Sequence, residues 1–297
     1  MAGAVRRTST AGNRWTPYLF ILPAFLVYGA VVLYPLARSV HLSLFDWDGL
    51  TLATFVGADN YVAILGDDRL IAAFGHAFVF IFFYAVLPVS IGLVMATLLT
   101  RSRVRGLSVF RTIIFLPQVI AMVVVAVAWR QVYAPDGVLN TALRTVGLDS
   151  LTRAWLGDYA FSLPAVGIIG TWVSTGLVTV LLMAGMARIP VEQFESARLD
   201  GAGPIREFFS IIVPAVRAET TVALTLTVVA SLKTFDLIYV TTGGGPGSST
   251  TVPSYEVYRR AFELGQVGSA AAVGVTLTVI IFLISLVINR ASDRATS

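Results

Sequence analysis

Residues 195–214 read Glu195-Ser-Ala-Arg-Leu-Asp-Gly-Ala-Gly-Pro-Ile-Arg-Glu-Phe-Phe-Ser-Ile-Ile-Val-Pro214, a charged and glycine-broken stretch between two long apolar segments. Upstream, Pro190 suits the first turn of a helix, where its missing N–H would have no partner in any case. Gly201 and Gly203 can end that helix, and Pro204 can begin a second one. The pattern predicts two short helices joined at glycine, a compact shape suited to docking another protein.

The segments outside this stretch are strongly apolar. The 297 residues are 56% hydrophobic and 13% charged, with a mean hydropathy of +0.81. Soluble domains are about half apolar and a quarter charged. A helix that crosses a bilayer needs about 20 apolar residues and pairs its own backbone groups. We therefore predict an all-α, polytopic membrane protein with six transmembrane helices at about residues 17–37, 71–99, 108–130, 163–187, 218–240 and 268–289.

The distribution of charge predicts the orientation of these helices. Most arginines fall on the side that carries the N-terminus, and most acidic residues fall on the other side. Because basic loops stay in the cytoplasm, we expect both termini and the charged stretch to be cytoplasmic. This gives a cytoplasmic tail at 1–16, a transmembrane permease domain at 17–290 with a coupling loop at 188–217, and a C-terminal tail at 291–297.

Several kinds of chemistry are disfavoured. The chain has no cysteine and only His41 and His76, so we predict no metal site and no thiol or disulfide chemistry. The basic residues are scattered among short loops, which is unlike a nucleic-acid footprint. The only lysine, Lys233, is not part of a phosphate-binding GxxxxGK[ST] loop, so the chain does not hydrolyse ATP by that route. We predict no catalytic residues.

The charged stretch resembles the EAA loop of ABC importer permeases, with Ser196 at a position where that family usually has alanine. The resemblance implies that the loop docks on a separate ATPase subunit and transmits its closure. The residues that match the motif, and are therefore expected to couple to the ATPase, are Glu195, Ala197, Asp200, Gly201, Ala202, Phe208 and Pro214.

Further segments resemble the carbohydrate-uptake branch of these permeases, and in particular its maltose-type larger subunit. They are Pro17–Pro23, Tyr34-Pro35, Phe45-Asp-Trp47, Asn60-Tyr61, Leu116-Pro117 and Phe235–Pro246, so the resemblance covers nearly the whole chain. It implies a multi-pass permease in the plasma (inner) membrane of a prokaryote that forms half of the path for a sugar. The implied partners are a second, homologous permease, two ATPase subunits, an extracellular sugar-binding protein and membrane lipid. ATP and Mg would bind at the ATPase subunits, with no cofactor bound directly by this chain.

The same resemblance suggests residues that line the substrate path. Counted from Glu195, the equivalents of sugar-contacting positions are Gly170, Ser174, Leu177, Thr227 and Ser231, and the Leu-Pro landmark adds Gln118. Uncharged Gln, Ser and Thr side chains match sugar hydroxyls, and Trp172 could cover a pyranose ring. The alternatives are hydrogen bonds within or between helices for the hydroxyls and packing for the tryptophan. Gly170 and Leu177 lack polar side chains, which suggests a different sugar or pose.

Lys233 and Asp236 lie three residues apart in the fifth predicted span. A charge within the membrane is costly, so we expect an ion pair between them. The alternative is that Lys233 binds an anionic group such as a phosphate ester.

Two other classes of function are alternatives to an ABC importer permease. A proton- or ion-coupled carrier would commonly show internal repeats and carboxylates within its spans, but no repeat is visible and Asp236 is the sole acid in mid-span. An intramembrane enzyme is disfavoured by the lone histidines and the lack of cysteine. Uptake without an ATPase partner would favour the first, and turnover by purified protein would favour the second.

Overall fold

The fold is an elongated helical bundle, described by the computed structural model over residues 16–101 and 106–294. Four helices in these residues are long and apolar enough to cross a membrane, and the number of spans rises to as many as six if each of two bent helix pairs is counted as one span. The only strands in the described residues, β1 (Phe45–Asp46) and β2 (Thr54–Phe55), form one short antiparallel pair. The predicted helical membrane fold is therefore confirmed, with this small hairpin as an addition.

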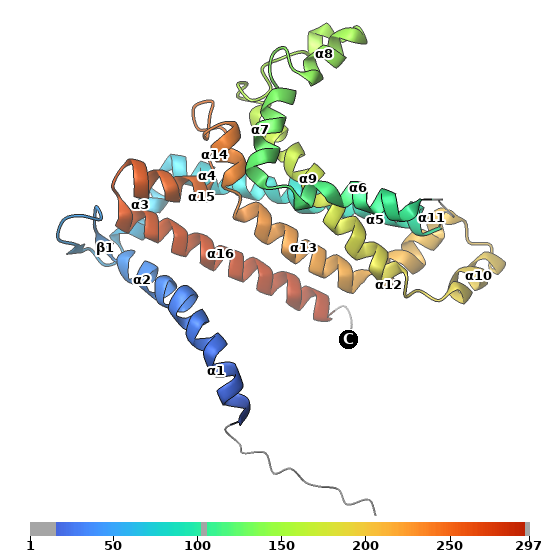
Figure 1. The fold of residues 1–297 in the computed structure, drawn as a ribbon, viewed down its shortest axis with the longest axis horizontal. Coiled ribbons are helices and arrows are strands. Elements are labelled where there is room, and N and C mark those ends of the chain that lie inside the picture. The colour runs from blue at the N-terminus through green and yellow to red at the C-terminus, as the bar shows by residue number, and fades with distance from the viewer. Residues whose placement is uncertain (1–15, 102–105, 295–297) are drawn as a thin grey trace, which may run out of the picture.

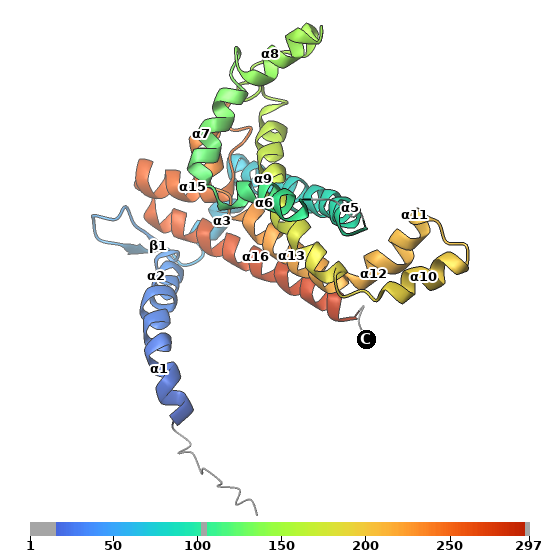
Figure 2. The ribbon, with the colours of Figure 1, turned by 45° about the vertical axis from the view of Figure 1, so that its right-hand side comes forward.

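The N-terminal part of the first span stands apart from the bundle, and its C-terminal part contacts the bundle (Figures 1 and 2). This span consists of α1 (Thr16–Tyr28), the π-helical turn η1 (Gly29–Leu33) and α2 (Tyr34–Leu42). None of its most apolar window is buried by the rest of the chain. The hairpin and α3 (Asp59–Leu65) follow, and Asn60 ties them together by donating to the carbonyl oxygens of Ser43 and Phe45.

The second span is long and continuous. Asp67 caps it by accepting hydrogen bonds from the backbone N–H groups of Arg69 and Leu70. Such a cap satisfies donors that lack a partner at a helix start. The span comprises α4 (Asp68–Ile81), η2 (Phe82–Val86) and α5 (Leu87–Arg101).

The third predicted span, 108–130, is not one straight helix. Helix α6 (Leu107–Val119) and α7 (Met122–Val132) meet at an angle of 98°, with an extended residue, Ile120, between them. Helix α7 turns away from the bundle and carries α8 (Val138–Thr145) and the 3-10 turn η3 (Asp149–Leu151) with it (Figure 1).

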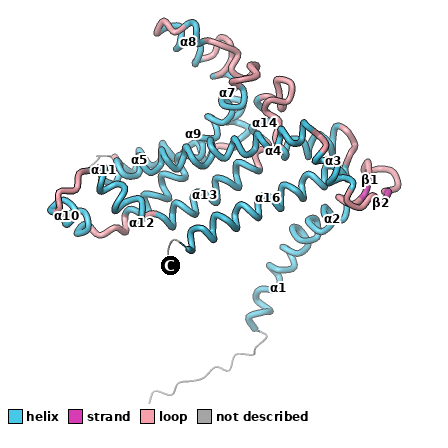
Figure 3. The backbone as a smooth tube through the Cα atoms, turned by 180° about the vertical axis from the view of Figure 1, so that it is seen from behind, coloured by secondary structure: helices cyan, strands magenta, loops and turns pink. Residues whose placement is uncertain are grey.

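Helix α9 (Ser162–Met186) is the centre of the bundle, packed against α5 and α6. Small residues allow this approach: a Cβ on Gly176 would lie 2.1 Å from the Ile114 carbonyl oxygen. After α9 come α10 (Val191–Leu199), α11 (Pro204–Glu207), η4 (Phe208–Ile212) and α12 (Val213–Ala215). These four elements lie beyond one end of the bundle (Figures 1 and 3).

The fifth predicted span, 218–240, is shorter than expected. Helix α13 (Arg217–Leu232) ends eight residues early, and the separate helix α14 (Asp236–Thr241) follows a non-helical link. The remaining elements are α15 (Pro253–Tyr258), the π-helical turn η5 (Arg259–Glu263) and the last span, α16 (Val267–Arg294). Helix α16 packs along α13 and against α15.

Candidate coupling segment and substrate path

We call residues 188–217 the coupling segment. Its two short helical parts, α10 and α11 to α12, are joined by residues 200–203, as the glycine pattern predicts. Gly201 has a φ of +80° and a Cβ placed there would have open space around it. The turn therefore needs glycine for its backbone conformation rather than for space.

Two ion pairs hold the coupling segment in shape. Arg198 on α10 donates from Nε to Glu207 Oε1 on α11 at 2.9 Å, and Glu207 is only 2% exposed. Arg188, at the end of α9, pairs with Glu219 at the start of α13. The first pair joins the two helical parts across the glycine turn, and the second joins the two ends of the segment. Sequence reasoning named neither pair, although the charges are visible in the sequence.

The outer surface of the coupling segment carries apolar and charged side chains. Leu199, Ile205 and Phe209 are 90%, 76% and 65% exposed, and the predicted docking residues Glu195 and Asp200 are also exposed. Such apolar groups rimmed by charge are typical of a protein interface.

The inner side of the segment packs on the bundle through two phenylalanines. Val191 is 64% exposed, whereas Phe194 and Phe208 are half-buried against the bundle core. Ala197, Ala202 and Asp200 border a small cavity of about 190 Å³ between the helical parts. Pro214 is exposed in the last helical turn before α13.

The two α13 candidates of the substrate path face the interior. Thr227 and Ser231 are 2% and 1% exposed, and their hydroxyls donate to the carbonyls of Ala223 and Val228 at 2.8 Å each. Both hydroxyls are therefore satisfied within their own helix in this conformation.

The α9 candidates divide into buried and exposed residues. Gly170 packs on the ring of Tyr84, because a Cβ there would lie 2.0 Å from it, and Ser174 is 6% exposed. Leu177 is partly buried. Trp172, in contrast, is 42% exposed.

Trp172 and Gln118 lie near the break in the third span. Gln118 is exposed in the last turn of α6, and its neighbour Pro117 shares a cavity of about 390 Å³ with Trp172. The Trp172 ring meets Trp129 of α7 edge-on, with centroids 5.7 Å apart. Of the path candidates, these two are the ones with exposed side chains.

The expected ion pair between Lys233 and Asp236 is absent from the described residues. Helix α13 ends at Leu232, so the two side chains do not share a helical face, and both are exposed. The link between α13 and α14 removes the i, i+3 geometry on which that prediction depended.

A buried charge cluster joins α4, α15 and η5, and sequence reasoning missed it. Glu256 is fully buried and accepts hydrogen bonds from Arg69 at 2.7 Å and Arg259 at 2.9 Å, while Arg260 contacts Asp67. The hydrogen bonds to Glu256 raise the pKa of Arg259. Burial acts to raise the pKa of Asp67, but the Leu70 N–H and Arg260 outweigh it and the pKa is lowered. Within the described residues, no group of three or more His, Asp or Glu side chains could hold a metal ion.

Comparisons with known proteins identify the family. Residues 88–297 match the family described as "Binding-protein-dependent transport system inner membrane component". The chain is 38% identical to the probable ABC transporter permease protein YurN of Bacillus subtilis, over 92% of this chain and 94% of that one. It is 32% identical to the diacetylchitobiose uptake system permease protein NgcF of Streptomyces coelicolor, over 97% of this chain and 86% of that one.

A solved structure supports the same fold. The chain superimposes on a chain of a bacterial ABC transporter involved in the import of the acidic polysaccharide alginate, with a TM-score of 0.81 and 22% identity. The match covers 95% of this chain and 96% of that one.

Proposed function

Because the chain belongs to the binding-protein-dependent transport system inner membrane components, and is thus an ABC transporter permease, we propose that it forms half of a sugar path driven by a separate ATPase. The coupling segment carries this proposal. It projects beyond the bundle, its shape is held by Arg198 and Glu207, and it offers exposed apolar side chains to a partner. Closure of the ATPase subunits would move the segment, and α9 and α13 would move with it because they adjoin its ends.

A sugar is the substrate class that we propose. NgcF is named for diacetylchitobiose uptake, and this chain matches it over nearly its whole length. The exposed Trp172 ring can cover the apolar face of a sugar ring, and the Gln118 amide can both donate to and accept from hydroxyls. The buried Thr227 and Ser231 would contact substrate only after α13 or its neighbours move. A second permease would supply the other half of the path, and an extracellular protein would deliver the sugar.

An anionic substrate is the second candidate. Lys233 is exposed, and no carboxylate pairs with it in the described residues. A sugar or polyol phosphate could use that charge.

Uptake by the assembled transporter in vesicles tests the proposal. Neutral mono-, di- and oligosaccharides and a sugar phosphate would be offered with the binding protein, and uptake and ATP hydrolysis would be measured together. We expect a neutral sugar to stimulate both and Trp172→Ala to lower the uptake. Phe282→Ala, which removes an even more exposed ring from α16 (64% exposed, against 42% for Trp172), is the control. Equal uptake by the Trp172→Ala and Phe282→Ala variants would remove Trp172 from the path. Uptake of the sugar phosphate alone, with loss of that uptake in Lys233→Gln, would favour an anionic substrate.

A further inference from the structure

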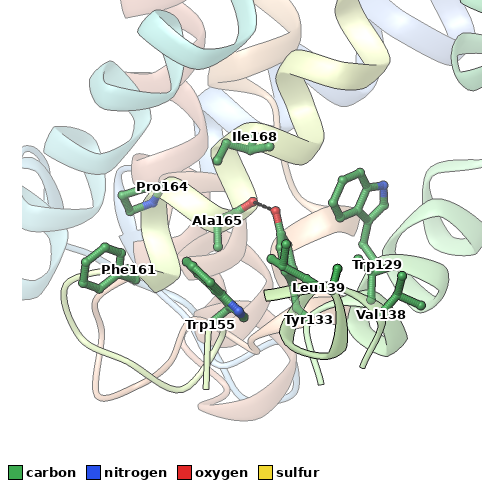
Figure 4. Close-up of a pocket in the computed structure, with 11 residues that line it drawn as sticks. Trp129, Tyr133, Val138, Leu139, Trp155, Phe161, Pro164, Ala165 and Ile168 are labelled. Carbon is green, nitrogen blue, oxygen red and sulfur yellow. Dashed lines mark hydrogen bonds between the residues drawn. The ribbon is translucent and has the colours of Figure 1, made fainter. Parts of the chain in front are cut away.

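A cavity of about 470 Å³ lies between α7, α8 and the start of α9, well away from the coupling segment. Its walls are aromatic and aliphatic: Trp129, Tyr133, Trp155 and Phe161 line it together with Leu139 and Ile168 (Figure 4). A pocket of this size suits a small molecule or one chain of a larger one.

The polar atoms of two of these aromatic residues, Tyr133 and Trp155, already have partners. The Tyr133 hydroxyl donates to the Ala165 carbonyl at 3.1 Å, a bond drawn in Figure 4, and Trp155 Nε1 donates to Asn140 Oδ1 at 2.9 Å. A sugar in this cavity would leave its hydroxyls without partners, which costs free energy for each buried group. The lining therefore favours a hydrocarbon occupant.

The cavity lies where two spans end. Helix α7 finishes at Val132 and α9 begins at Ser162, so the cavity is at the membrane–water boundary. Tryptophan and tyrosine are enriched at that boundary. Val138 and Ile168, which border the cavity, are 71% and 49% exposed, so its apolar surface continues to the outside of the chain.

A cation lies at the edge of the cavity. The Arg153 guanidinium is 3.8 Å from the centre of the Phe161 ring and 5.3 Å from that of Trp155, and its Nε donates to the Leu151 carbonyl. No carboxylate pairs with Arg153 in the described part of the chain. Its terminal N–H groups are thus available for an anion, and guanidinium groups match the geometry of phosphate oxygens.

We propose that this cavity binds one acyl chain of an anionic phospholipid whose phosphate is held by Arg153. A transmembrane helix of a second permease fits less well. A helix 10–12 Å wide that rises 5.4 Å per turn fills roughly 500 Å³ per turn, so the cavity holds no more than one turn. An apolar helix would also bring no negative charge to Arg153.

The test is native mass spectrometry of the assembled transporter, purified in detergent and titrated with phosphatidylglycerol or with phosphatidylcholine. Ala142 lines the cavity from an exposed position on α8, whereas its exposed neighbour Thr141 does not line it. Ala142→Phe should fill the cavity, and Thr141→Phe is the matched control. We expect several-fold less bound phosphatidylglycerol with Ala142→Phe and unchanged binding with Thr141→Phe. Arg153→Gln should abolish the preference for phosphatidylglycerol, whereas Arg144→Gln, an exposed arginine on the same helix as Ala142, should not.

Three results would overturn the proposal. They are equal lipid binding by the two phenylalanine variants, no preference of the unmodified transporter for the anionic lipid, and loss of the second permease from the Ala142→Phe complex with lipid binding unchanged. The last result would assign the cavity to the permease contact. None of these measurements depends on the identity of the transported solute.

Discussion

The glycine turn of the coupling segment allows a test of backbone conformation alone, because an added side chain meets no neighbouring atom. Gly201 and Gly203 lie two residues apart, both are exposed, and a Cβ at either position meets nothing within 4 Å. They differ in backbone conformation: Gly201 has a φ of +80°, whereas Gly203 has a φ of −79° and a ψ of 171°. A side chain is strained at the first position and comfortable at the second.

The expected penalty follows from this difference. A residue other than glycine in the left-handed region costs about 1–2 kcal/mol, and a β-branched residue is among the least tolerant. A penalty of that size lowers the ratio of the native turn to its alternative conformations by a factor of about 5–30. Gly201→Val should therefore reduce transport and the stimulation of ATP hydrolysis by up to that factor. Gly203→Val should transport like the unmodified protein.

The assay is uptake and ATP hydrolysis by the reconstituted transporter, with the amount of membrane-inserted protein measured in parallel. Equal insertion of both valine variants, with loss of coupling only in Gly201→Val, is the expected pattern. If Gly201→Val transports normally, or if both variants lose activity equally, the turn does not set the shape of the coupling segment.

Four further variants test other contacts. Arg198→Ala should lower coupled transport because it leaves the buried Glu207 carboxylate without this partner, and normal uptake would show that the pair is dispensable. Glu195→Lys should weaken association with the ATPase, measured by co-purification, and unchanged recovery would argue against contact there. Ser231→Leu should lower uptake with assembly intact because the buried site has little room for a larger side chain. Ser231→Ala keeps the size but removes the hydroxyl, so lowered uptake by this variant would show that substrate uses the hydroxyl and normal uptake would show that it does not. Glu256→Gln should cost up to about 3 kcal/mol because partly buried arginines lose the buried counter-charge, seen as a lower melting temperature than in the exposed-site control Glu263→Gln.

The sequence predicted the membrane fold because span length and apolarity follow from the bilayer. It did not predict the break between α6 and α7, since Pro117, the obvious helix breaker, lies inside α6 while the chain turns at Ile120. The early end of α13 at Leu232 also has no glycine or proline to signal it. Both departures depend on packing against other helices, which local sequence does not encode.

The parts of the coupling segment that depend on backbone conformation could be predicted from the sequence. The two helical parts and the turn at Gly201 follow from glycine and proline positions alone. The contact between Arg198 and Glu207 requires knowing how those parts fold back on each other. The charges around Glu256 come from segments 187 residues apart, as the bond from Arg69 shows, so only the tertiary structure brings them together.

The central claim is that an ATPase subunit grips the coupling segment, and site-specific cross-linking tests it directly. The chain has no cysteine, so one can be introduced at Leu199, which is 90% exposed on the coupling segment, or at Leu50, which is 93% exposed on the hairpin between β1 and β2. With a short reagent that couples to the introduced thiol at one end and carries a photoreactive group at the other, Leu199→Cys should join this chain to the ATPase in the assembled transporter and Leu50→Cys should not. A product from Leu50→Cys, or none from Leu199→Cys, would contradict the account.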